Sequence, residues 1–185
     1  MDAPNPHTFP REGDIGKILL NEETIQNRVA ELGAQISADY QGRKPLLISI
    51  LKGSVVFVAD LLRAIDAPVE IDFMAVSSYG SGTKSSGAVK IVKDLDRAVS
   101  GRDVVLVEDI IDSGLTARYL LNYFRSQNAA SLQICTLLLR DDPDREPIDI
   151  KYVGFELPPA FVIGYGLDVD QEYRNLPYIA EYARA

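Results

Sequence analysis

The sequence predicts an α/β fold in which a twisted, mainly parallel sheet is flanked by helices on both faces. Strand-like and helix-like segments alternate from residue 46 to residue 139. Two of the strand-like segments, LLISIL (46–51) and SLQICTLLL (131–139), are apolar on both faces. Such strands are typical of a parallel sheet buried between two helical layers. The 185 residues suffice for a sizeable core, so we expect a single domain over 1–185.

The segment NEETIQNRVAELGAQISADY (21–40) is predicted to form the first long helix. Asn21 can cap its amino end, and two glutamates follow where the helix dipole favours negative charge. Apolar side chains recur at helical spacing and form one stripe: Ile25, Val29, Leu32, Ile36 and Tyr40. The stripe indicates that the helix packs one face against the rest of the domain. The preceding KILLN (17–21) is a candidate short strand.

The core of the predicted domain, about 21–140, continues with alternating elements. These are a helix over 54–65 that Gly53 opens, strands over 70–79 and 101–109, a helix over 114–128, and the strand over 131–139. GSGTKSSGAVK (80–90) is predicted to be a Gly/Ser loop. The connections between parallel strands are expected to be right-handed.

The two ends of the chain differ from the core in composition and in their pattern of apolar residues. MDAPNPHTFPREGD (1–14) is acidic and rich in proline, and it is predicted to be a disordered or surface-draped arm. From residue 147 onward, short strand-like runs alternate with prolines and aromatic residues. We therefore expect a small hood subdomain, built from about 1–20 and 141–185, that rests over the edge of the sheet.

Composition excludes several classes of function. The formal net charge of −8 argues against general nucleic-acid binding, which needs a basic face to neutralise phosphates. No segment approaches the length of a membrane span, and the first residues do not resemble a signal peptide, so no membrane partner is expected. The single cysteine, Cys135, fits a buried position in a cytoplasmic protein. The single histidine, His7, disfavours histidine-based catalysis and a histidine-rich metal site.

The segment VVLVEDIIDSGLTA (104–117) carries the clearest functional signal. Val104–Val107 suit a central strand, and ligands of open α/β sheets bind beyond the carboxyl ends of such strands. Small residues then lead into a helix, whose first backbone N–H groups and positive dipole can hold a phosphate. The hydroxyls of Ser113 and Thr116 can add donors, and Gly114 lets a ligand approach the backbone.

The two acids Glu108 and Asp109 refine this interpretation. Carboxylates repel a bare phosphate, but they accept hydrogen bonds from sugar hydroxyls or bind a divalent cation. The segment therefore indicates a site for a phosphorylated ribose. The alternative is purely structural: Asp112 and Ser113 would cap a helix, and the acids would be solvated charges at a strand end.

These residues resemble the phosphoribosyl pyrophosphate motif of type I phosphoribosyltransferases. Three further stretches resemble the hypoxanthine-guanine phosphoribosyltransferase branch: ISILKGSVVF, SSYGSGTKSSGAVKIVKDL and YVGFELPPAFVIGYGLDVDQEYRNLPYI. The resemblance extends over nearly all of residues 15–180. It implies the type I phosphoribosyltransferase fold and an enzyme of purine salvage. Such an enzyme transfers phosphoribose from phosphoribosyl pyrophosphate to hypoxanthine or guanine, giving IMP or GMP and pyrophosphate, with Mg²⁺ as cofactor.

The resemblance assigns roles around the central motif. Glu108 and Asp109 would hold the ribose hydroxyls, and Ser113, Gly114, Leu115 and Thr116 would hold the 5′-phosphate. Asp112 would accept a proton near purine N7 as the general base, a role that contributes roughly 10²–10⁴ in rate. Metal contacts are implied for Asp168, Glu108 and Asp109, mostly through water in the case of Asp168.

Further roles follow for the segments before this motif. Lys52 and Gly53 match the pyrophosphate loop of the family, where the Leu51–Lys52 peptide is expected to be cis. Taken alone, Lys52 could also be a solvated lysine at a strand end. Ser78 and Tyr79 match the start of a lid loop. Residues 80–87 do not continue as a phosphate-binding loop, because a strand-like segment follows them rather than a helix. A plain flexible hairpin is the alternative to a lid.

The C-terminal tail supplies the purine side of the implied site. Phe161 would stack on the purine, the backbone of Val162 would read its edge, and Asp168 would lie nearby. Arg174 would contact pyrophosphate, for which a guanidinium is well suited. Without the resemblance, Phe161 would be interpreted as core and the two charged residues as a surface pair.

Two residues depart from the family pattern. Arg140 stands where the family usually has a lysine that donates to the 6-oxo group of the purine, and Leu115 stands where a lysine is common. The choice among hypoxanthine, guanine and xanthine is therefore open. A transferase for xanthine or a pyrimidine, and a regulator that binds phosphoribosyl pyrophosphate without turnover, are the alternatives. Relatives are dimers or tetramers, so a homodimer or homotetramer is expected.

Overall fold

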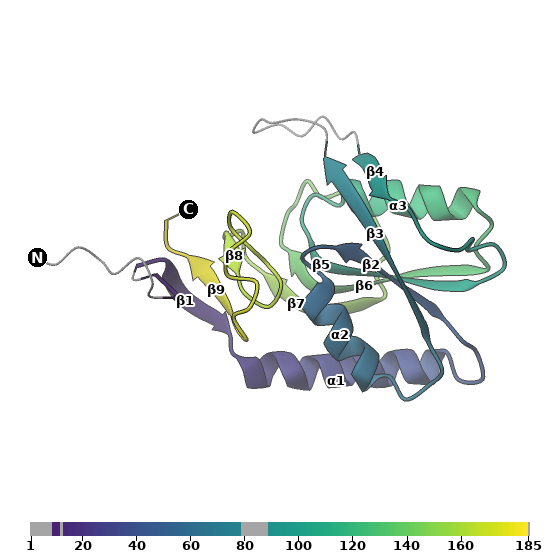
Figure 1. Ribbon diagram of the computed structural model, residues 1–185, viewed down its shortest axis with the longest axis horizontal. Helices are drawn as coiled ribbons and strands as arrows, with labels where there is room; N and C mark the ends of the chain where they lie inside the picture. Colours follow the sequence, from purple (N-terminus) through teal and green to yellow (C-terminus); the bar gives the residue numbers. More distant parts are fainter. Residues whose placement is uncertain (1–8, 12, 79–88, 185) are drawn as a thin grey trace, which may run out of the picture.

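The computed structural model describes residues 9–11, 13–78 and 89–184. Its centre is a six-stranded sheet in the order β4-β3-β2-β5-β6-β7 (Figure 1). The strands are β2 (Leu46–Leu51), β3 (Glu70–Ser78), β4 (Val89–Lys93), β5 (Asp103–Ile111), β6 (Ser131–Arg140) and β7 (Tyr152–Leu157). Neighbouring strands are parallel except β4, which is antiparallel to β3. The predicted α/β fold with a mainly parallel sheet is confirmed.

Helices cover both faces of this sheet. The helices α1 (Glu22–Asp39) and α2 (Val55–Ala64) lie together on one face, and α3 (Leu115–Ser126) lies on the other (Figure 1). Successive side chains of β2 point to alternate faces. Leu47 packs in the buried cluster under α1 and α2, whereas Leu46 and Ile48 pack in the cluster under α3. Burying one such side chain contributes about 1.5–3 kcal/mol, so both helical layers stabilise the sheet.

The helix α1 forms as its sequence pattern predicts. The Asn21 side chain caps it by accepting a hydrogen bond from the Thr24 backbone N–H at 2.8 Å. The residues of the predicted apolar stripe are all buried: Ile25, Val29, Leu32, Ile36 and Tyr40. Periodicity and capping therefore placed this helix to within one residue at each end.

A second, smaller sheet forms the hood. It contains β1 (Ile15–Leu20), β9 (Ile179–Tyr182) and β8 (Val162–Ile163) in that order, all antiparallel, and it lies apart from the six-stranded sheet in Figure 1. The described residues just before β1 pack on this sheet and its loops. The Phe9 ring stacks on Tyr173 at 5.4 Å, and Arg11 pairs with Glu172 at 2.6 Å. The two ends of the chain thus come together in the hood.

The predicted hood boundary at residue 141 is wrong for β7. This strand pairs in parallel with β6 and completes the central sheet at its edge. Its sequence, YVGFEL, lacks the continuous apolar run of an interior strand, because an edge strand is only partly covered. Gly154 reflects the tight pairing, since a Cβ there would lie 2.3 Å from the Leu137 carbonyl oxygen.

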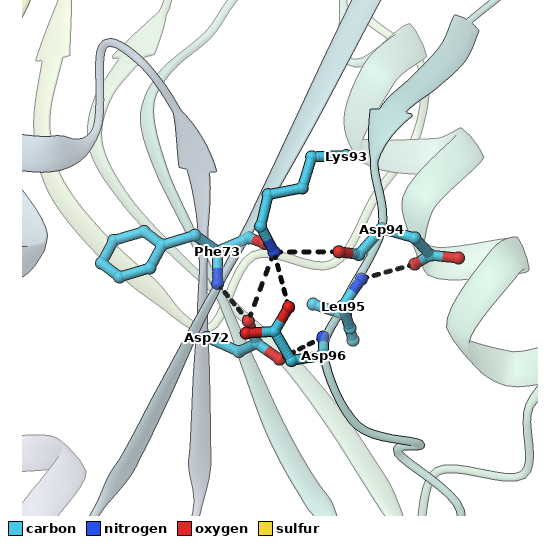
Figure 2. Close-up of polar contacts among 6 residues, drawn as sticks. All are labelled: Asp72, Phe73, Lys93, Asp94, Leu95 and Asp96. Carbon is cyan, nitrogen blue, oxygen red and sulfur yellow. Dashed lines mark hydrogen bonds and ion pairs between the residues drawn. The ribbon is translucent and has the colours of Figure 1, made fainter.

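A polar network fixes the outer edge of the sheet, where β4 meets β3. Figure 2 shows Lys93 donating to the Phe73 carbonyl at 2.8 Å and to the Asp94 carbonyl at 2.9 Å. The buried Asp72 accepts from the backbone N–H groups of Phe73 and Asp96, at 2.7 and 2.9 Å. Because Asp72 has these partners, its burial costs less than that of a free carboxylate. The network therefore joins the amino half of β3 to the carboxyl end of β4 and to the residues that follow it.

The other end of this pair leads into the predicted lid. Ser78 is the last residue of β3 and pairs with Val89, the first of β4. Tyr79 and most of the predicted Gly/Ser loop, residues 80–88, lie outside the described residues. Across the described ranges, no helix is both long and apolar enough to cross a membrane.

Candidate active site

The candidate site is built at the carboxyl end of β5. This strand continues two residues beyond its predicted end, so Ile110 and Ile111 belong to it and Ile111 is buried. An open pocket of about 220 Å³ lies here, next to the carboxyl end of β2. It is lined by Ile50, Leu51, Val76, Glu108–Gly114, Thr116 and Ala117. The sequence motif therefore lines one continuous pocket, as a ligand-binding motif should.

The turn between β5 and α3 has the geometry of an anion cradle. Gly114 precedes the helix with a left-handed φ of +78°, a conformation that glycine adopts without strain. Within the described part of the chain, no side chain caps the helix, so the first N–H groups of α3 are left for a ligand or for water. The purely structural alternative, in which Asp112 or Ser113 caps α3, is thereby contradicted.

Burial perturbs the two acids of the site. Glu108 is only 6% exposed, so it is not a solvated charge, and burial followed by the charge of Asp109 raises its pKa well above the ordinary value. Burial also raises the pKa of Asp109, against the opposing effects of backbone N–H groups and Arg174. Such carboxyl groups gain from hydroxyl donors or from a cation, which fits a ribose or a metal ion.

The turn after β2 packs directly against these acids. The Leu51–Lys52 peptide is cis, as the resemblance implies. A Cβ on Gly53 would lie 1.6 Å from Oδ2 of Asp109, and a Cβ on Gly166 would lie 2.0 Å from the Gly53 carbonyl oxygen. The turn is therefore held between the end of β5 and the hood loop that contains Gly166.

The hood loop brings further charged groups to this turn. Arg174 pairs with Asp168 at 2.7 Å and donates to the Gly166 carbonyl at 2.7 Å. Lys52 donates to the side-chain oxygen of Gln171 at 2.9 Å, and Arg174 lies 3.3 Å from the same oxygen. The structure thus brings Lys52 together with Asp168 and Arg174, which follow it by more than 100 residues in the sequence. The role of Gln171 as a bridge was not anticipated, since nothing in its neighbourhood signals the contact.

The predicted purine residues Arg140, Phe161 and Val162 lie at the carboxyl end of β6 and at the start of β8. Arg140, at the end of β6, contacts Asp112 with Nε–Oδ1 at 2.9 Å and donates to the Ala160 carbonyl at 2.5 Å. Phe161 is 49% exposed, so the interpretation of it as a core residue is wrong. Val162 begins β8 and is buried. The Phe161 ring contacts the Tyr182 ring with centroids 6.0 Å apart, and its exposed part is accessible to a flat ligand.

The segment after β6 braces the phosphate turn in a way that the sequence did not reveal. The Glu146 backbone N–H donates to the Ser113 carbonyl at 3.0 Å, and the Glu146 carboxylate pairs with Arg118 at 2.5 Å. Arg145 donates to the Arg140 carbonyl at 2.8 Å. None of these three contacts could be anticipated, because RDDPDREP has no regular pattern that fixes its path.

Comparison with known proteins agrees with this geometry. Residues 16–170 match the family model described as the phosphoribosyl transferase domain. A hypoxanthine-guanine phosphoribosyltransferase of Bacillus subtilis is 56% identical over 168 residues, covering 90% of this chain and 92% of that protein. The enzyme of the same name from Mycobacterium tuberculosis is 54% identical over 173 residues, covering 90% and 86% of the two chains.

A solved structure has the same fold. The crystal structure of a hypoxanthine phosphoribosyltransferase from Staphylococcus aureus superimposes with a TM-score of 0.90 at 44% identity, covering 96% of both chains. The fold and the site at the end of β5 define a phosphoribosyltransferase, an enzyme that transfers a ribose phosphate. Within that class, the chain belongs to the hypoxanthine-guanine phosphoribosyltransferase family of purine salvage.

Proposed function

We propose that this enzyme transfers the 5-phosphoribosyl group of phosphoribosyl pyrophosphate to N9 of hypoxanthine or guanine. One observation carries the proposal: the phosphate turn, the acids Glu108 and Asp109, and Asp112 all line one pocket at the end of β5. The phosphate turn can hold the 5′-phosphate, the two acids can bind the sugar hydroxyls, and Asp112 can accept the proton that the purine loses. Bonds and protons balance when the C1′–O bond to pyrophosphate breaks, the C1′–N9 bond forms and the N7 proton passes to Asp112.

The ribose phosphate would lie along β5 and the first turn of α3. Backbone N–H groups at 113–116 would hold the 5′-phosphate, and the dipole of α3 favours its negative charge. The carboxylates of Glu108 and Asp109 would accept hydrogen bonds from the ribose hydroxyls. Leu115 contributes no charge, so the proposed phosphate site relies on backbone groups.

The leaving pyrophosphate would lie between the turn after β2 and the hood loop. The side chains of Lys52 and Arg174 both contact Oε1 of Gln171, so their two positive charges lie close together. Two cations there would stabilise the charge that develops on the leaving group. This placement separates the departing group from the purine, which would stack on Phe161 beyond Asp112 and Arg140. The backbone of Val162 would read the edge of the purine ring.

A magnesium ion fits the donor set. The described residues contain no group of three or more acidic, cysteine or histidine side chains able to hold a metal. Mg²⁺ is usually held by one or two carboxylates together with water and substrate phosphates, and Asp168, Asp109 and Glu108 can supply such oxygens. When bound, the ion would neutralise charge on the pyrophosphate.

The assay that tests the proposal uses the purified protein with Mg²⁺, phosphoribosyl pyrophosphate and one base at a time. Hypoxanthine, guanine, xanthine and a pyrimidine are compared by nucleotide formation. We expect IMP or GMP to form fastest. Nucleotide from xanthine alone would reassign the substrate, and Arg140 is the residue that keeps this second candidate open. No nucleotide from any base would leave a regulator that binds the substrate without turnover.

The assembly and the location in the cell complete the proposal. We propose a homodimer or homotetramer, which light scattering on the purified protein would test. A monomer at micromolar concentration would contradict it. A cytoplasmic location accords with the lone cysteine, Cys135, which is buried with its pKa raised by burial. Such a thiol is a poor candidate for disulfide exchange.

A further inference from the structure

The hood loop that carries Asp168 and Arg174 has an unusual backbone. Four non-glycine residues in or beside it have a left-handed φ: Tyr165 (+49°), Asp170 (+50°), Gln171 (+69°) and Tyr173 (+74°). This conformation is unfavourable for residues with a side chain, and it persists only where the surroundings hold it in place. The contacts that hold these residues therefore determine where Asp168 and Arg174 lie.

The start of the loop is fixed to the core. The Tyr165 hydroxyl donates to Asp60 of α2 at 2.5 Å, and the Gly166 backbone N–H donates to the Arg174 carbonyl at 2.9 Å. These contacts anchor one side of the loop. The turn at 170–173 is closed internally by the backbone pair of Val169 and Glu172 and by the Gln171 N–H, which donates to Oδ2 of Asp168 at 2.9 Å. Its position relative to the core depends on further contacts.

The end of the loop is fixed to the N-terminal arm. Tyr173 is only 2% exposed, and its hydroxyl donates a hydrogen bond to Oδ2 of Asp14. Asp14 is itself 1% exposed, and its other oxygen pairs with Arg184 at 2.6 Å. Burial and the bond to Asp14 raise the pKa of Tyr173 to about 12, so the phenol stays protonated and keeps donating. The Asp14 carbonyl also accepts from the Ala183 N–H at 2.9 Å.

The side chain of Arg174 has no comparable anchor outside the loop. Its described hydrogen bonds and its ion pair go to Gly166, Asp168 and Gln171, which belong to the same loop. Arg174 directly follows Tyr173 in the chain, so a shift of Tyr173 moves the guanidinium. Asp14, more than 150 residues away in sequence, is thus linked to the proposed pyrophosphate site through one buried hydroxyl.

We propose that Tyr173, held by Asp14, is a positioning residue for the Asp168–Arg174 pair, and that it sets the affinity for phosphoribosyl pyrophosphate and pyrophosphate. The inference rests on the proposed function, since it takes Arg174 as a pyrophosphate contact. Neither Tyr173 nor Asp14 touches the substrate in this account. Their effect is to hold this end of the loop in its left-handed conformation.

The test compares Tyr173→Phe with the wild-type protein. The variant keeps the ring and its packing against Phe9 but removes the hydroxyl. We expect the KM for phosphoribosyl pyrophosphate to rise about tenfold, with the KM for the purine within about twofold, because only one end of the site is displaced. Calorimetric titration with pyrophosphate and Mg²⁺ should show a matching rise in Kd. This titration needs no turnover, so it tests the inference even if no purine is accepted.

The control is Tyr178→Phe, which removes a hydroxyl from the same aromatic cluster. No hydrogen bond of that hydroxyl occurs in the described part of the chain, so all kinetic constants should stay within about twofold. If Tyr173→Phe only lowers the thermal midpoint or kcat and leaves both KM values unchanged, Tyr173 is merely structural and the proposal is overturned.

Variants of Asp14 test the same hydrogen bond independently. They test the proposal even if Tyr173→Phe does not fold. Asp14→Leu removes the acceptor at similar size and should reproduce the rise of about tenfold. Asp14→Asn keeps an acceptor oxygen and should raise the KM for phosphoribosyl pyrophosphate less than about threefold. The double variant Asp14→Leu/Tyr173→Phe should be no worse than Asp14→Leu alone, since Asp14→Leu has already broken the Tyr173–Asp14 hydrogen bond and the Arg184 ion pair is lost in both. Additive losses would overturn the proposed link.

Discussion

Gly53 lies so close to Asp109 that a Cβ on the glycine would stand 1.6 Å from Oδ2 of the carboxylate. The backbone of the turn after β2 therefore packs directly against the Asp109 side chain at the end of β5, where no Cβ would fit. These strands are neighbours in the parallel sheet, so their carboxyl ends meet at one edge. The proposed pyrophosphate turn and the proposed ribose contact are thus parts of one packed unit.

Replacement of Gly53 by alanine tests this packing. The added methyl group must displace Asp109 or the turn, because its Cβ would overlap Oδ2 of the carboxylate. We expect kcat/KM for phosphoribosyl pyrophosphate to fall by about 10²-fold, the loss typical of a displacement of roughly 1 Å in a site. Steady-state kinetics would check this.

The matched control is Gly42→Ala, where the added Cβ meets nothing within 4 Å but φ is +73°. That change should cost about 1 kcal/mol of stability and leave kcat/KM unaltered. Equal kinetic losses in both variants would show that a general loss of stability, and not the contact with Asp109, determines activity.

The buried Glu108 gives a prediction for stability and pH. Its pKa is raised by burial and by the charge of Asp109, so the folded chain binds more protons than the unfolded chain above the ordinary value of 4.5. The free energy of unfolding therefore falls as pH rises through that interval. Glu108→Gln should raise the thermal midpoint at pH 8, by about 2–4 °C for each kcal/mol recovered. The gain should shrink as pH approaches 4.5.

The exposed Glu156 supplies the control for this comparison. Glu156→Gln removes a carboxylate from the same sheet without relieving burial, so its effect on the midpoint should be small at every pH. Thermal melts from pH 4.5 to 8 would distinguish the two variants. A thermal midpoint for Glu108→Gln that stays below the wild-type value at pH 8 would contradict the prediction that the buried Glu108 carboxyl group destabilises the fold at that pH.

The interior of the fold could be predicted because its signals are local. The strand at 46–51 is a continuous apolar run, and the stripe from Ile25 to Tyr40 has helical period. The edge strand β7 could not be placed, since Gly154 and Glu156 interrupt its pattern. Its position depends on pairing with β6, a contact that no local rule supplies.

The candidate site divides in the same way. Residues 108–116 are contiguous, so one motif shows the acids and the phosphate turn together. The bridge from Lys52 to Gln171 joins segments more than 100 residues apart. It also depends on left-handed backbone at Asp170 and Gln171, which no glycine signals. Only the resemblance to a family, and not the physical pattern, could assign Lys52 and Arg174 to one site.

Asp112→Asn tests the proposed general base. The carboxylate is 63% exposed and contacts Arg140, so the amide should fit without disturbing the fold. Binding of phosphoribosyl pyrophosphate should be retained, while kcat should fall by about 10²–10⁴, the usual contribution of a placed base. Turnover within a few-fold of wild type at every pH tested would exclude Asp112 as the proton acceptor.

Arg140→Lys tests whether the contact between Arg140 and Asp112 shapes base selectivity. The guanidinium spans from Asp112 to the Ala160 carbonyl, and a lysine has a single ammonium group that cannot reproduce that fork. We expect the ranking of hypoxanthine, guanine and xanthine by kcat/KM to change, with at least one ratio shifted about tenfold, because each lost charge-assisted hydrogen bond is worth about 1.5–3 kcal/mol. Arg118→Lys, whose arginine pairs with Glu146 rather than with Asp112, is the control and should keep the wild-type ranking. An unchanged ranking in Arg140→Lys would remove Arg140 from the specificity of the enzyme and leave Phe161 and the Val162 backbone as the groups that choose the base.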